Sequence, residues 1–339
     1  MTPRRGIVKG RGDVQRRVLI LAGGGGHTGY GYALAEALHG KVPLSFVVPK
    51  GDSLSERRLS KFGKVDFLVK PRGPKTSFPA SVTRSFRAFM ESLSHPINEF
   101  DVVVSTGSNF CVPLAIVAWI KGIPVVNIES PVRFIKPSKS AFFLHPFSVT
   151  TALHWREQKR FLDGTVVGPI LPKPVVEPRN EGYILVAGGT YGHRLLFKAI
   201  VESDLSDVVL QTGKVDSTPY IKKHPGWKAF AVLEDFHEVL AGAELVVTHL
   251  GVTVLEAAMY KKPVVLVPNP EWTRTGSVED ARYLAKKVNA VFVSEISVEA
   301  LLHGIEEARR RKVPALQNGA GNLANIVVRL LSERDANGL

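Results

Sequence analysis

Short apolar runs rich in β-branched residues alternate with helix-like stretches along this chain, and this alternation limits the possible folds more than any other feature. Five runs precede residue 130 and four follow residue 180. The runs are VLILA (18–22), LSFVVP (44–49), DFLV (66–69), DVVVS (101–105), PVVNI (124–128), YILVA (183–187), DVVLQ (207–211), ELVVT (244–248) and PVVLVP (263–268). Such alternation is typical of parallel βαβ units. The sequence therefore predicts an α/β protein with two Rossmann-like, parallel-sheet domains in tandem.

A proline-rich stretch separates the two series of runs. Four prolines, at positions 169, 172, 174 and 178, interrupt the hydrogen bonding of both helix and sheet. We therefore expect a flexible basic arm at 1–16, a first domain at 17–168, a linker at 169–180, and a second domain with C-terminal helices at 181–339. A chain of 339 residues is long enough for two such domains.

Positive charge is concentrated in the first half of the chain. Residues 1–170 carry 24 Lys and Arg against 11 Asp and Glu, whereas residues 171–339 carry 20 of each sign. The first half is therefore expected to meet an anionic partner, which is a nucleic acid, an anionic membrane surface or a phosphorylated substrate. The single cysteine, Cys111, excludes an internal disulfide framework and a Cys-rich metal site. The longest strongly apolar run, 110–120, contains Pro113 and is too short to span a bilayer.

Each predicted domain opens with a strand that runs into a glycine-rich turn. The two segments are LILAGGGGHTGYG (19–31) and ILVAGGTYGH (184–193). Glycine lets the backbone bend sharply beside a ligand, and the helix that follows offers unpaired N–H groups to an anion. One such turn can simply pack a helix against a strand, but its occurrence in both domains favours two phosphate sites. Gly24, Gly26 and Gly29 also satisfy G-x-G-x-x-G, yet the second strand ends without the acidic residue that a nicotinamide cofactor site requires.

His27 lies in the first glycine-rich turn, and the ordinary histidine pKa near ~6.5 suits a general base. The loops STGSNFCVP (105–113) and NIESPVRFIKP (127–137) follow the fourth and fifth strands, at the same carboxyl edge of a doubly wound sheet. Glu129 is therefore expected in the same crevice, where it holds an acceptor hydroxyl, orients His27 or acts as the base. A carboxylate that only caps the next segment is the structural alternative. Arg133 is placed to pair with a phosphate.

The segment VVTHLGVTVLEAAMYKKPVVLVPN (246–269) is the most specific one in the second half. A strand ends at His249, a small-residue turn contains Gly251 and Thr253, and Glu256 is expected in the first turn of the next helix. The N–H groups of the turn suit a diphosphate, and the Glu256 carboxylate can accept hydrogen bonds from both hydroxyls of a ribose. A glutamate near a helix start also interacts favourably with the helix dipole without any ligand.

Taken together, these motifs resemble the GT-B glycosyltransferases of family 28. The chain is similar to a single-chain, archaeal-type fusion of the two-subunit eukaryotic UDP-N-acetylglucosamine:dolichyl-diphosphate-N-acetylglucosamine transferase, which is related to MurG. The resemblance to the membrane-associated subunit rests on GGGGHTGYG, RSFRAFMESL (84–93), VVVSTGSNFCVPLA and NIES. The resemblance to the donor-binding subunit rests on VAGGTYGHRL, VVLQTGK, VVTHLG and LEAAMYKKPVVLVPN. It extends from Arg17 to about Lys287.

The resemblance implies that the first domain binds a polyprenyl(dolichyl)-diphosphate-linked sugar and that the second binds UDP-N-acetylglucosamine at an interdomain cleft. It implies transfer of N-acetylglucosamine with inversion, without a divalent metal or another cofactor, and with His27 and Glu129 as catalytic residues. The implied donor-binding residues are Gly188, Gly189, Thr190, His249, Gly251, Thr253 and Glu256. The implied acceptor- or phosphate-binding residues are Gly25, Gly26, Thr28, Thr106, Gly107, Asn109 and Arg133.

One difference from the family concerns the donor sugar. Relatives carry a Gln after the VPN strand that touches the sugar, whereas this chain has no Gln between Gln211 and Gln317. Glu279 or Asp280 is expected to take its place. The turn between His249 and Glu256 is also one residue shorter than the usual Gly-Ser-Gly-Ser type.

An apolar stripe at helical spacing lies between the third and fourth predicted strands. Its members are Val82, Phe86, Phe89, Met90 and Leu93, with Phe78 before them and Arg84 and Arg87 alongside. Such a stripe suits a membrane interface, although core packing of an amphipathic helix gives the same pattern. Because the first half is basic, we expect peripheral attachment to an anionic membrane surface at the cytoplasmic face of the cell membrane, with 133–147 as a second contact.

Two other functions stay open. A UDP-N-acetylglucosamine 2-epimerase-like enzyme of the same architecture would use the same donor without a lipid acceptor. A basic nucleic-acid-binding protein would explain the charge, but the basic and aromatic residues form no recognisable RNA-binding signature, so no nucleic-acid partner is expected. If the protein is a transferase, we expect it to add the second sugar of an N-glycan precursor.

Overall fold

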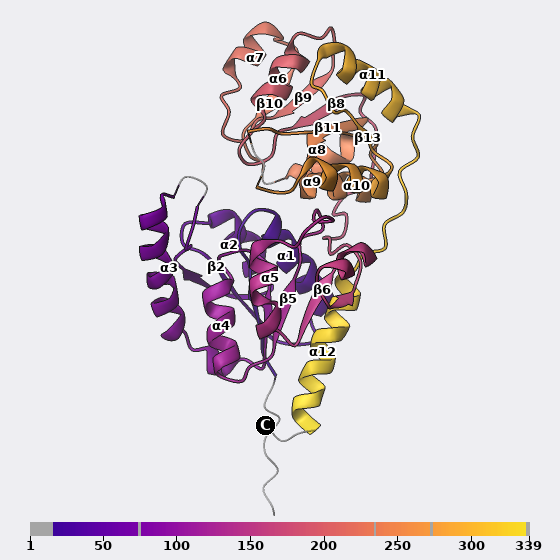
Figure 1. The fold of residues 1–339 in the computed structure, drawn as a ribbon. Helices are drawn as coiled ribbons and strands as arrows, with labels where there is room; N and C mark the ends of the chain where they lie inside the picture. Colours follow the sequence, from indigo (N-terminus) through magenta and orange to yellow (C-terminus); the bar gives the residue numbers. More distant parts are fainter. Residues whose placement is uncertain (1–15, 74–75, 234, 272–273, 337–339) are drawn as a thin grey trace, which may run out of the picture.

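The computed structural model describes residues 16–73, 76–233, 235–271 and 274–336, so the expected basic arm lies outside the described residues except for Arg16. Within these ranges the chain forms two parallel sheets, and the helices around each sheet give two lobes stacked one above the other (Figure 1). Strands buried on both faces are expected to be almost entirely apolar, and the central strands β1 (Val18–Leu21), β8 (Ile184–Ala187) and β12 (Val264–Val267) contain only apolar residues, while β4 (Val102–Ser105) ends in Ser105. The predicted α/β class with two Rossmann-like domains is confirmed.

The first sheet has the order β3-β2-β1-β4-β5-β6-β7, with every neighbouring pair parallel. Its strands are β1 (Val18–Leu21), β2 (Leu44–Pro49), β3 (Gly63–Leu68), β4 (Val102–Ser105), β5 (Val125–Ile128), β6 (Thr150–Leu153) and β7 (Thr165–Val166). Its helices are α1 (Gly26–Leu38), α2 (Ser53–Ser60), α3 (Phe78–Leu93), α4 (Val112–Ile120) and α5 (Lys139–Leu144), with 3-10 turns at Ile97–Glu99, His145–Phe147 and Arg156–Arg160.

The second sheet has the order β10-β9-β8-β11-β12-β13 and is also parallel throughout. Its strands are β8 (Ile184–Ala187), β9 (Val208–Gln211), β10 (Lys228–Phe230), β11 (Leu245–His249), β12 (Val264–Val267) and β13 (Val291–Phe292). The helices after β8 are α6 (Arg194–Val201), α7 (Thr218–Lys223), α8 (Phe236–Gly242), α9 (Val252–Met259), α10 (Val278–Val288), α11 (Val298–Arg309) and α12 (Ala320–Ala336).

Helix α12 corrects the expected boundary of the second domain, which placed all of 181–339 in one unit. The helix returns to the first lobe and lies beside α1 (Figure 1). Leu323 and Val327 on α12 are fully buried in the core that also contains Val18 and Leu34. The apolar face of α12 is therefore the reason that the end of the chain completes the first lobe.

The chain crosses between the lobes twice, and the two crossings touch. In the predicted linker, Ile170 and Leu171 are buried rather than exposed. The side-chain amide of Asn318, on the second crossing, donates to the Leu171 carbonyl at 2.6 Å, and the Gly319 N–H donates to the Pro169 carbonyl at 2.6 Å. The linker is thus held along its first residues by the return of the chain to α12.

A continuous apolar seam also joins the lobes. The core of the second lobe includes Val132, Phe134 and Trp155 from the first lobe. The Phe134 ring is stacked between Trp155, at 5.9 Å, and Tyr283 on α10, at 5.6 Å between ring centroids. The two lobes therefore pack as one body along this edge.

Candidate active site

The two lobes meet where helices α1 and α9 begin. A Cβ on Gly26 would lie only 2.7 Å from Cγ2 of Val252, so glycine is needed where α1 approaches the other lobe. Both helices follow strands at the carboxyl edge of their sheets, which is where ligands bind in open α/β sheets. Neither Gly25 nor Gly251, the residues that precede these helices, provides a side-chain cap for the first N–H groups.

His27 lies in the first turn of α1 and is held by the loop after β4. Its Nδ1 is 2.7 Å from the Thr106 carbonyl oxygen. Because a carbonyl only accepts, Nδ1 carries the proton, and neutral His27 keeps its lone pair on Nε2. Burial lowers the pKa of His27, which favours the neutral ring. The ring is therefore arranged to accept a proton at Nε2.

Tyr30 connects His27 to the second lobe, and the sequence analysis did not select it. Its ring lies edge-on to His27 at 5.8 Å between centroids and tilted toward His154 at 5.6 Å. Burial raises the pKa of Tyr30, and the nearby Glu256 carboxylate of α9 raises it further. His27 and Glu256 thus flank one tyrosine at the junction of the lobes. The spacing of three residues from His27 on a helix was the signal that could have found it.

Glu129 is fully buried, and its contacts correct the expected catalytic role. Its carboxylate accepts the N–H of Ser130 at 2.5 Å and the N–H of Ser138 at 3.0 Å, so both oxygens are used within its own loop. Burial raises the pKa of Glu129 to about 7 despite these bonds. Among the roles that the sequence left open for Glu129, the structure supports the structural one. Its carboxylate caps backbone N–H groups and so fixes the loop that leads into α5.

His154 secures the same loop from the end of β6. Its Nε2 donates to the Glu129 carbonyl at 2.8 Å, and its Nδ1 accepts the Ile170 N–H at 3.2 Å. Burial lowers the pKa of His154 to about 3, so the ring stays neutral. This histidine ties the first lobe to the start of the linker.

Three of the expected acceptor residues shape the loops from within. The buried Thr28 hydroxyl is 2.6 Å from the Ser55 hydroxyl, and the buried Thr106 hydroxyl donates to the Leu21 carbonyl at 2.8 Å. Gly107 has φ of 85°, and a Cβ there would lie 2.2 Å from the Ile128 carbonyl oxygen. These residues set the backbone path rather than present side chains to a ligand.

The other expected acceptor residues lie nearer the surface. Gly25 is exposed at the tip of the first glycine-rich turn, with φ of 58°. Asn109 is half-buried and donates to the Arg72 carbonyl at 3.2 Å. Arg133, expected to pair with a phosphate, donates across the lobes to the Arg274 carbonyl at 2.6 Å.

The second glycine-rich turn is held by Gln211 at the end of β9. The Gly189 N–H donates to Oε1 of Gln211 at 2.7 Å, and Nε2 of Gln211 donates back to the Gly189 carbonyl at 3.2 Å. Gly189 has φ of 64°, and a Cβ on Gly188 would lie 2.4 Å from Cζ of Phe197. The N–H of Gly189 is therefore already used, while Thr190 is exposed at the tip of the turn.

His249 lies against this turn at the end of β11. A Cβ on Gly189 would lie 3.2 Å from Cε1 of His249, and the His193 ring lies edge-on at 5.7 Å. Burial lowers the pKa of His249 to about 4, so its ring is neutral at physiological pH. His193 in turn donates from Nε2 to the Pro268 carbonyl at 2.9 Å. The expected donor residues 188–190 and His249 are thus brought together.

Glu256 is in the second turn of α9, not in the first turn as expected, because the helix begins at Val252. Thr253 occupies the first turn and is half-buried. Burial raises the pKa of Glu256, and Arg58 of α2 in the first lobe opposes that rise. Glu256 is half-buried, and its charge acts on Tyr30 of the first lobe, so it belongs to the junction with His27 and Tyr30.

Asp280 corrects the expectation that it replaces a sugar-binding glutamine. It is 0% exposed, and its Oδ1 accepts the N–H groups of Phe134 at 2.6 Å and of Ile135 at 3.0 Å from the first lobe. Its Oδ2 accepts the Ser277 N–H at 2.8 Å as part of a capping box. Asp280 therefore links the two lobes by hydrogen bonds, whereas Glu279 is exposed on α10.

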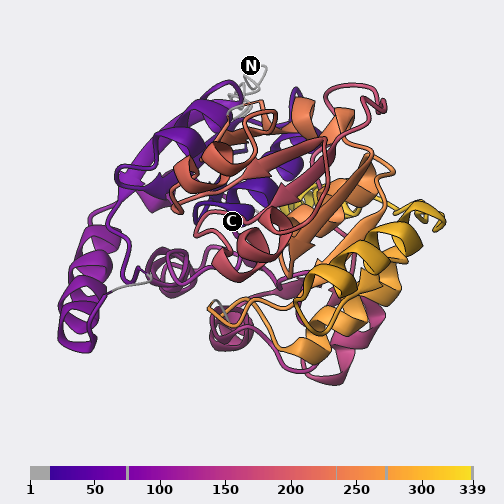
Figure 2. The same ribbon diagram turned by 90° about the horizontal axis from the view of Figure 1, so that it is seen from above.

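Helix α3 stands at the outer edge of the first lobe in both views (Figures 1 and 2). Its exposed face carries Val82, Phe86, Met90 and Leu93, flanked by exposed Arg84 and Arg87. Phe89 differs from the expected membrane contact, because it is half-buried against the core under α4. Phe78 begins the helix.

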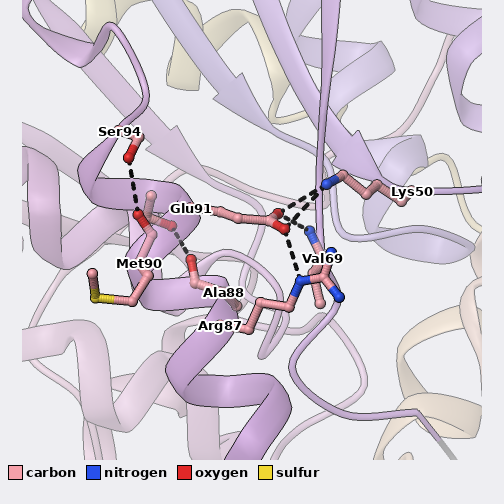
Figure 3. A network of polar contacts seen from close by, with 8 residues as sticks. Lys50, Val69, Arg87, Ala88, Met90, Glu91 and Ser94 are labelled. Carbon is pink, nitrogen blue, oxygen red and sulfur yellow. Dashed lines mark hydrogen bonds and ion pairs between the residues drawn. The ribbon is translucent and has the colours of Figure 1, made fainter.

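Glu91 anchors the inner side of α3 to the sheet. Its carboxylate accepts hydrogen bonds from Nζ of Lys50 at 3.1 Å, from the N–H of Val69 at 3.0 Å and from Nε of Arg87 at 3.1 Å (Figure 3). The helix is thus fixed by polar contacts at one face and leaves its apolar face uncovered.

Two further features of the described residues bear on function. No group of three or more His, Cys, Asp or Glu in this part of the chain is gathered as a metal site. No described helix is long and apolar enough to cross a membrane.

The sequence matches two family models, one for each lobe. Residues 18–168 match that of oligosaccharide biosynthesis protein Alg14 like, and residues 183–329 match that of the glycosyltransferase family 28 C-terminal domain. The chain is 28% identical over 313 residues to a UDP-N-acetylglucosamine–N-acetylmuramyl-(pentapeptide) pyrophosphoryl-undecaprenol N-acetylglucosamine transferase of Anaeromyxobacter sp. (strain Fw109-5), covering 82% of this chain and 81% of the relative. It is also 28% identical over 343 residues to the Myxococcus xanthus protein of the same name, covering 91% and 88%.

Solved structures share the fold. Acinetobacter baumannii MurG superposes with a TM-score of 0.63 at 16% identity, covering 93% of this chain and 99% of MurG. The UDP-GlcNAc 2-epimerase of Methanocaldococcus jannaschii superposes with a TM-score of 0.61 at 14% identity, covering 94% and 99%. These likenesses confirm the predicted GT-B architecture. The first lobe therefore matches the Alg14-like model and the second lobe the glycosyltransferase family 28 C-terminal model, within one GT-B fold.

Proposed function

We propose that this protein is an inverting glycosyltransferase that moves N-acetylglucosamine from UDP-N-acetylglucosamine to a sugar linked to a polyprenyl diphosphate. The observation that carries the proposal is the neutral His27, held at Nδ1 by Thr106 where the lobes meet, with Glu256 of the other lobe facing the same tyrosine. The names of the relatives support the substrate class, since they describe N-acetylglucosamine transfer to an undecaprenol diphosphate acceptor.

The reaction follows from these positions. The acceptor hydroxyl gives its proton to Nε2 of His27 and forms a bond to the anomeric carbon from the face opposite UDP. The bond between that carbon and the diphosphate oxygen breaks, and UDP leaves with the electron pair. General-base assistance of this kind contributes about 10² to 10⁴-fold. On the donor side, the Glu256 carboxylate binds the ribose hydroxyls, and the uncapped start of α9 stabilises the departing diphosphate.

The finer assignment is a dolichyl acceptor that already carries one N-acetylglucosamine, so that the product is the second sugar step of an N-glycan precursor. The Alg14-like first domain supports this choice over a peptidoglycan acceptor. The proposed mechanism assigns charge stabilisation to backbone N–H groups and needs no divalent metal. Transfer is therefore expected to continue in excess EDTA.

Attachment to the cytoplasmic face of a membrane follows from the acceptor. A polyprenyl chain stays in the bilayer, so the first lobe must reach its surface. The uncovered apolar face of α3, with Arg84 and Arg87 beside it, supports this contact. The exposed Phe142 and Phe143 of α5, within the expected second contact, add to the same lobe.

The test is to incubate the purified protein with labelled UDP-sugars and synthetic polyprenyl-diphosphate-linked N-acetylglucosamine, and to analyse the products. We expect UDP release and a disaccharide on the lipid, only with UDP-N-acetylglucosamine and only with acceptor present. The structural likeness to UDP-GlcNAc 2-epimerases makes epimerisation the second candidate. Conversion of the donor sugar without acceptor would favour the epimerase and overturn the proposal.

A further inference from the structure

A lysine that the sequence analysis did not select lies directly under the first glycine-rich turn. Lys70 follows strand β3, and its Nζ donates to the Gly23 carbonyl at 3.1 Å. A Cβ on Gly24 would lie 2.8 Å from Oδ2 of Asp52 and 3.7 Å from the same Nζ, so both charged groups approach the turn where Gly24 has no side chain. The turn therefore has the Lys70 ammonium and the Asp52 carboxylate on the side of Gly24, while Gly26 faces Val252 of the other lobe.

The charge of Lys70 is only partly compensated. Burial lowers the pKa of Lys70, and this effect is larger than the opposing attraction of Asp52. The Asp52 carboxylate is already engaged as the cap of α2, where it accepts the Ser55 N–H at 3.1 Å and the Ser55 hydroxyl at 2.7 Å. A half-buried ammonium with an engaged carboxylate as its counter-charge gains free energy when an anion approaches.

Lys70 shares its surroundings with the residues of the junction. Its positive charge contributes to lowering the pKa of His27, so the two groups lie close in space. Asn109, half-buried in the loop after β4, donates to the Arg72 carbonyl and ties the segment after Lys70 to that loop. A cation, glycine N–H groups and a proton acceptor within one loop cluster suit a phosphate group next to a reacting hydroxyl.

We propose that Lys70 binds the diphosphate of the lipid-linked acceptor. This inference rests on the proposed function and adds to it the residue that recognises the acceptor anion. The first lobe contributes Lys70 on the Gly24 side of the turn, whereas Val252 at the start of α9 approaches from the Gly26 side. The acceptor diphosphate thus lies on one side of His27 and the donor diphosphate on the other.

The test compares Lys70→Met with Lys64→Met. Lys64 is a matched control because its side chain is exposed on β3 of the same lobe. We expect Lys70→Met to raise the acceptor KM at least tenfold and to weaken inhibition by inorganic pyrophosphate, with UDP affinity unchanged. Lys70→Arg is expected to recover most of the acceptor affinity, whereas Lys64→Met changes nothing. A loss of UDP affinity with an unchanged acceptor KM would assign Lys70 to the donor, and unchanged values for both would leave it a structural cation; either result overturns the proposal.

Amine labelling of the wild-type protein tests the site without a substitution. We expect inorganic pyrophosphate to protect Lys70 from acylation, measured by mass spectrometry, while UDP alone does not protect it. Lack of protection by pyrophosphate contradicts the proposal even if Lys70→Met does not fold. If the wild-type protein transfers no sugar, the proposed function fails, and labelling still decides whether Lys70 binds a diphosphate. If transfer occurs and Lys70→Met leaves it unchanged, only the role of Lys70 fails.

Discussion

At the scale of single residues, the proposed mechanism rests on His27, whose tautomer is fixed by one hydrogen bond to Thr106. Replacing His27 by Ala removes the proton acceptor but leaves the second lobe intact. We expect the turnover number to fall about 10² to 10⁴-fold. Calorimetric titration is expected to give the same UDP affinity as the wild type. The exposed His39, at the end of the same helix, provides the control, and an unaltered rate in His27→Ala would remove His27 from the mechanism.

Glu129 gives a prediction for the pH dependence of stability. Burial raises the pKa of Glu129 to about 7, so between pH ~4.5 and ~7 the folded protein holds a proton that the unfolded chain releases. This contribution is complete below pH ~4.5 and is lost as the pH rises through about 7, for a total of about 3 kcal/mol. Urea unfolding of Glu129→Gln is expected to show a smaller decrease between pH 5 and pH 8 than the wild type. Parallel pH curves for the two proteins would rule out this titration, and Glu299→Gln on exposed α11 is the control.

The sequence predicted individual residues where a motif marks them. His27 and the glycines of both turns were selected because tight turns need glycine, and His249 was selected because it ends an apolar strand before a small-residue turn. Tyr30, His154, Gln211 and Lys70 were missed because their roles depend on partners distant in the chain, such as the Gly23 carbonyl for Lys70. Asp280 was assigned to the wrong role for the same reason, since its partners are N–H groups of the other lobe.

Helix α3 is the element that tests membrane attachment. Phe86 and Met90 lie on its exposed face, and burial of such a side chain contributes about 1.5 to 3 kcal/mol. The double substitution Phe86→Ser and Met90→Ser is therefore expected to weaken binding to vesicles containing anionic lipid at least ~10-fold, measured by sedimentation at low salt. Leu195→Ser, on exposed α6 of the second lobe, is expected to bind like the wild type. Equal binding by all three proteins would argue against α3 as the contact.

Strands could be predicted where the apolar run is long, and they were missed where the run is short. Strands β1, β2, β4, β5, β8, β9, β11 and β12 coincide with the predicted runs to within a residue or two at each end. Strands β7 and β13 have two residues each, and β10 contains Lys228, so none of them forms a recognisable run. The position of α12 was not predictable, because an amphipathic helix does not specify which of two sheets it will cover.

At the scale of the whole molecule, we expect the hydrogen bonds of Asp280 to hold the lobes together beside the apolar seam. Asp280→Ala leaves the buried N–H group of Phe134 without a partner, at about 1 to 3 kcal/mol, and also removes the partner of the Ile135 N–H. We expect the free energy of unfolding to fall by at least ~2 kcal/mol, and small-angle scattering to show a broader distribution of lobe separations.

Two control variants separate the effect of the interlobe hydrogen bonds of Asp280 from the effect of its capping of α10. Ser277→Ala weakens only the capping box, at about 0.5 to 2 kcal/mol, and is expected to leave the scattering curve unchanged. Glu279→Ala is expected to change stability by no more than about 0.5 kcal/mol, because this side chain is exposed. If Asp280→Ala matches Ser277→Ala in both measurements, the interlobe bonds do not hold the lobes together.

The anomeric configuration of the transferred sugar tests the central claim most directly, which is that both lobes form one site for a single displacement. The product of UDP-N-acetylglucosamine and a short-chain polyprenyl-diphosphate-N-acetylglucosamine can be analysed by the proton NMR coupling of its new glycosidic linkage. Attack opposite the α-linked UDP, with the proton passing to His27, predicts a β linkage. An α linkage would contradict a single displacement at the junction of the lobes.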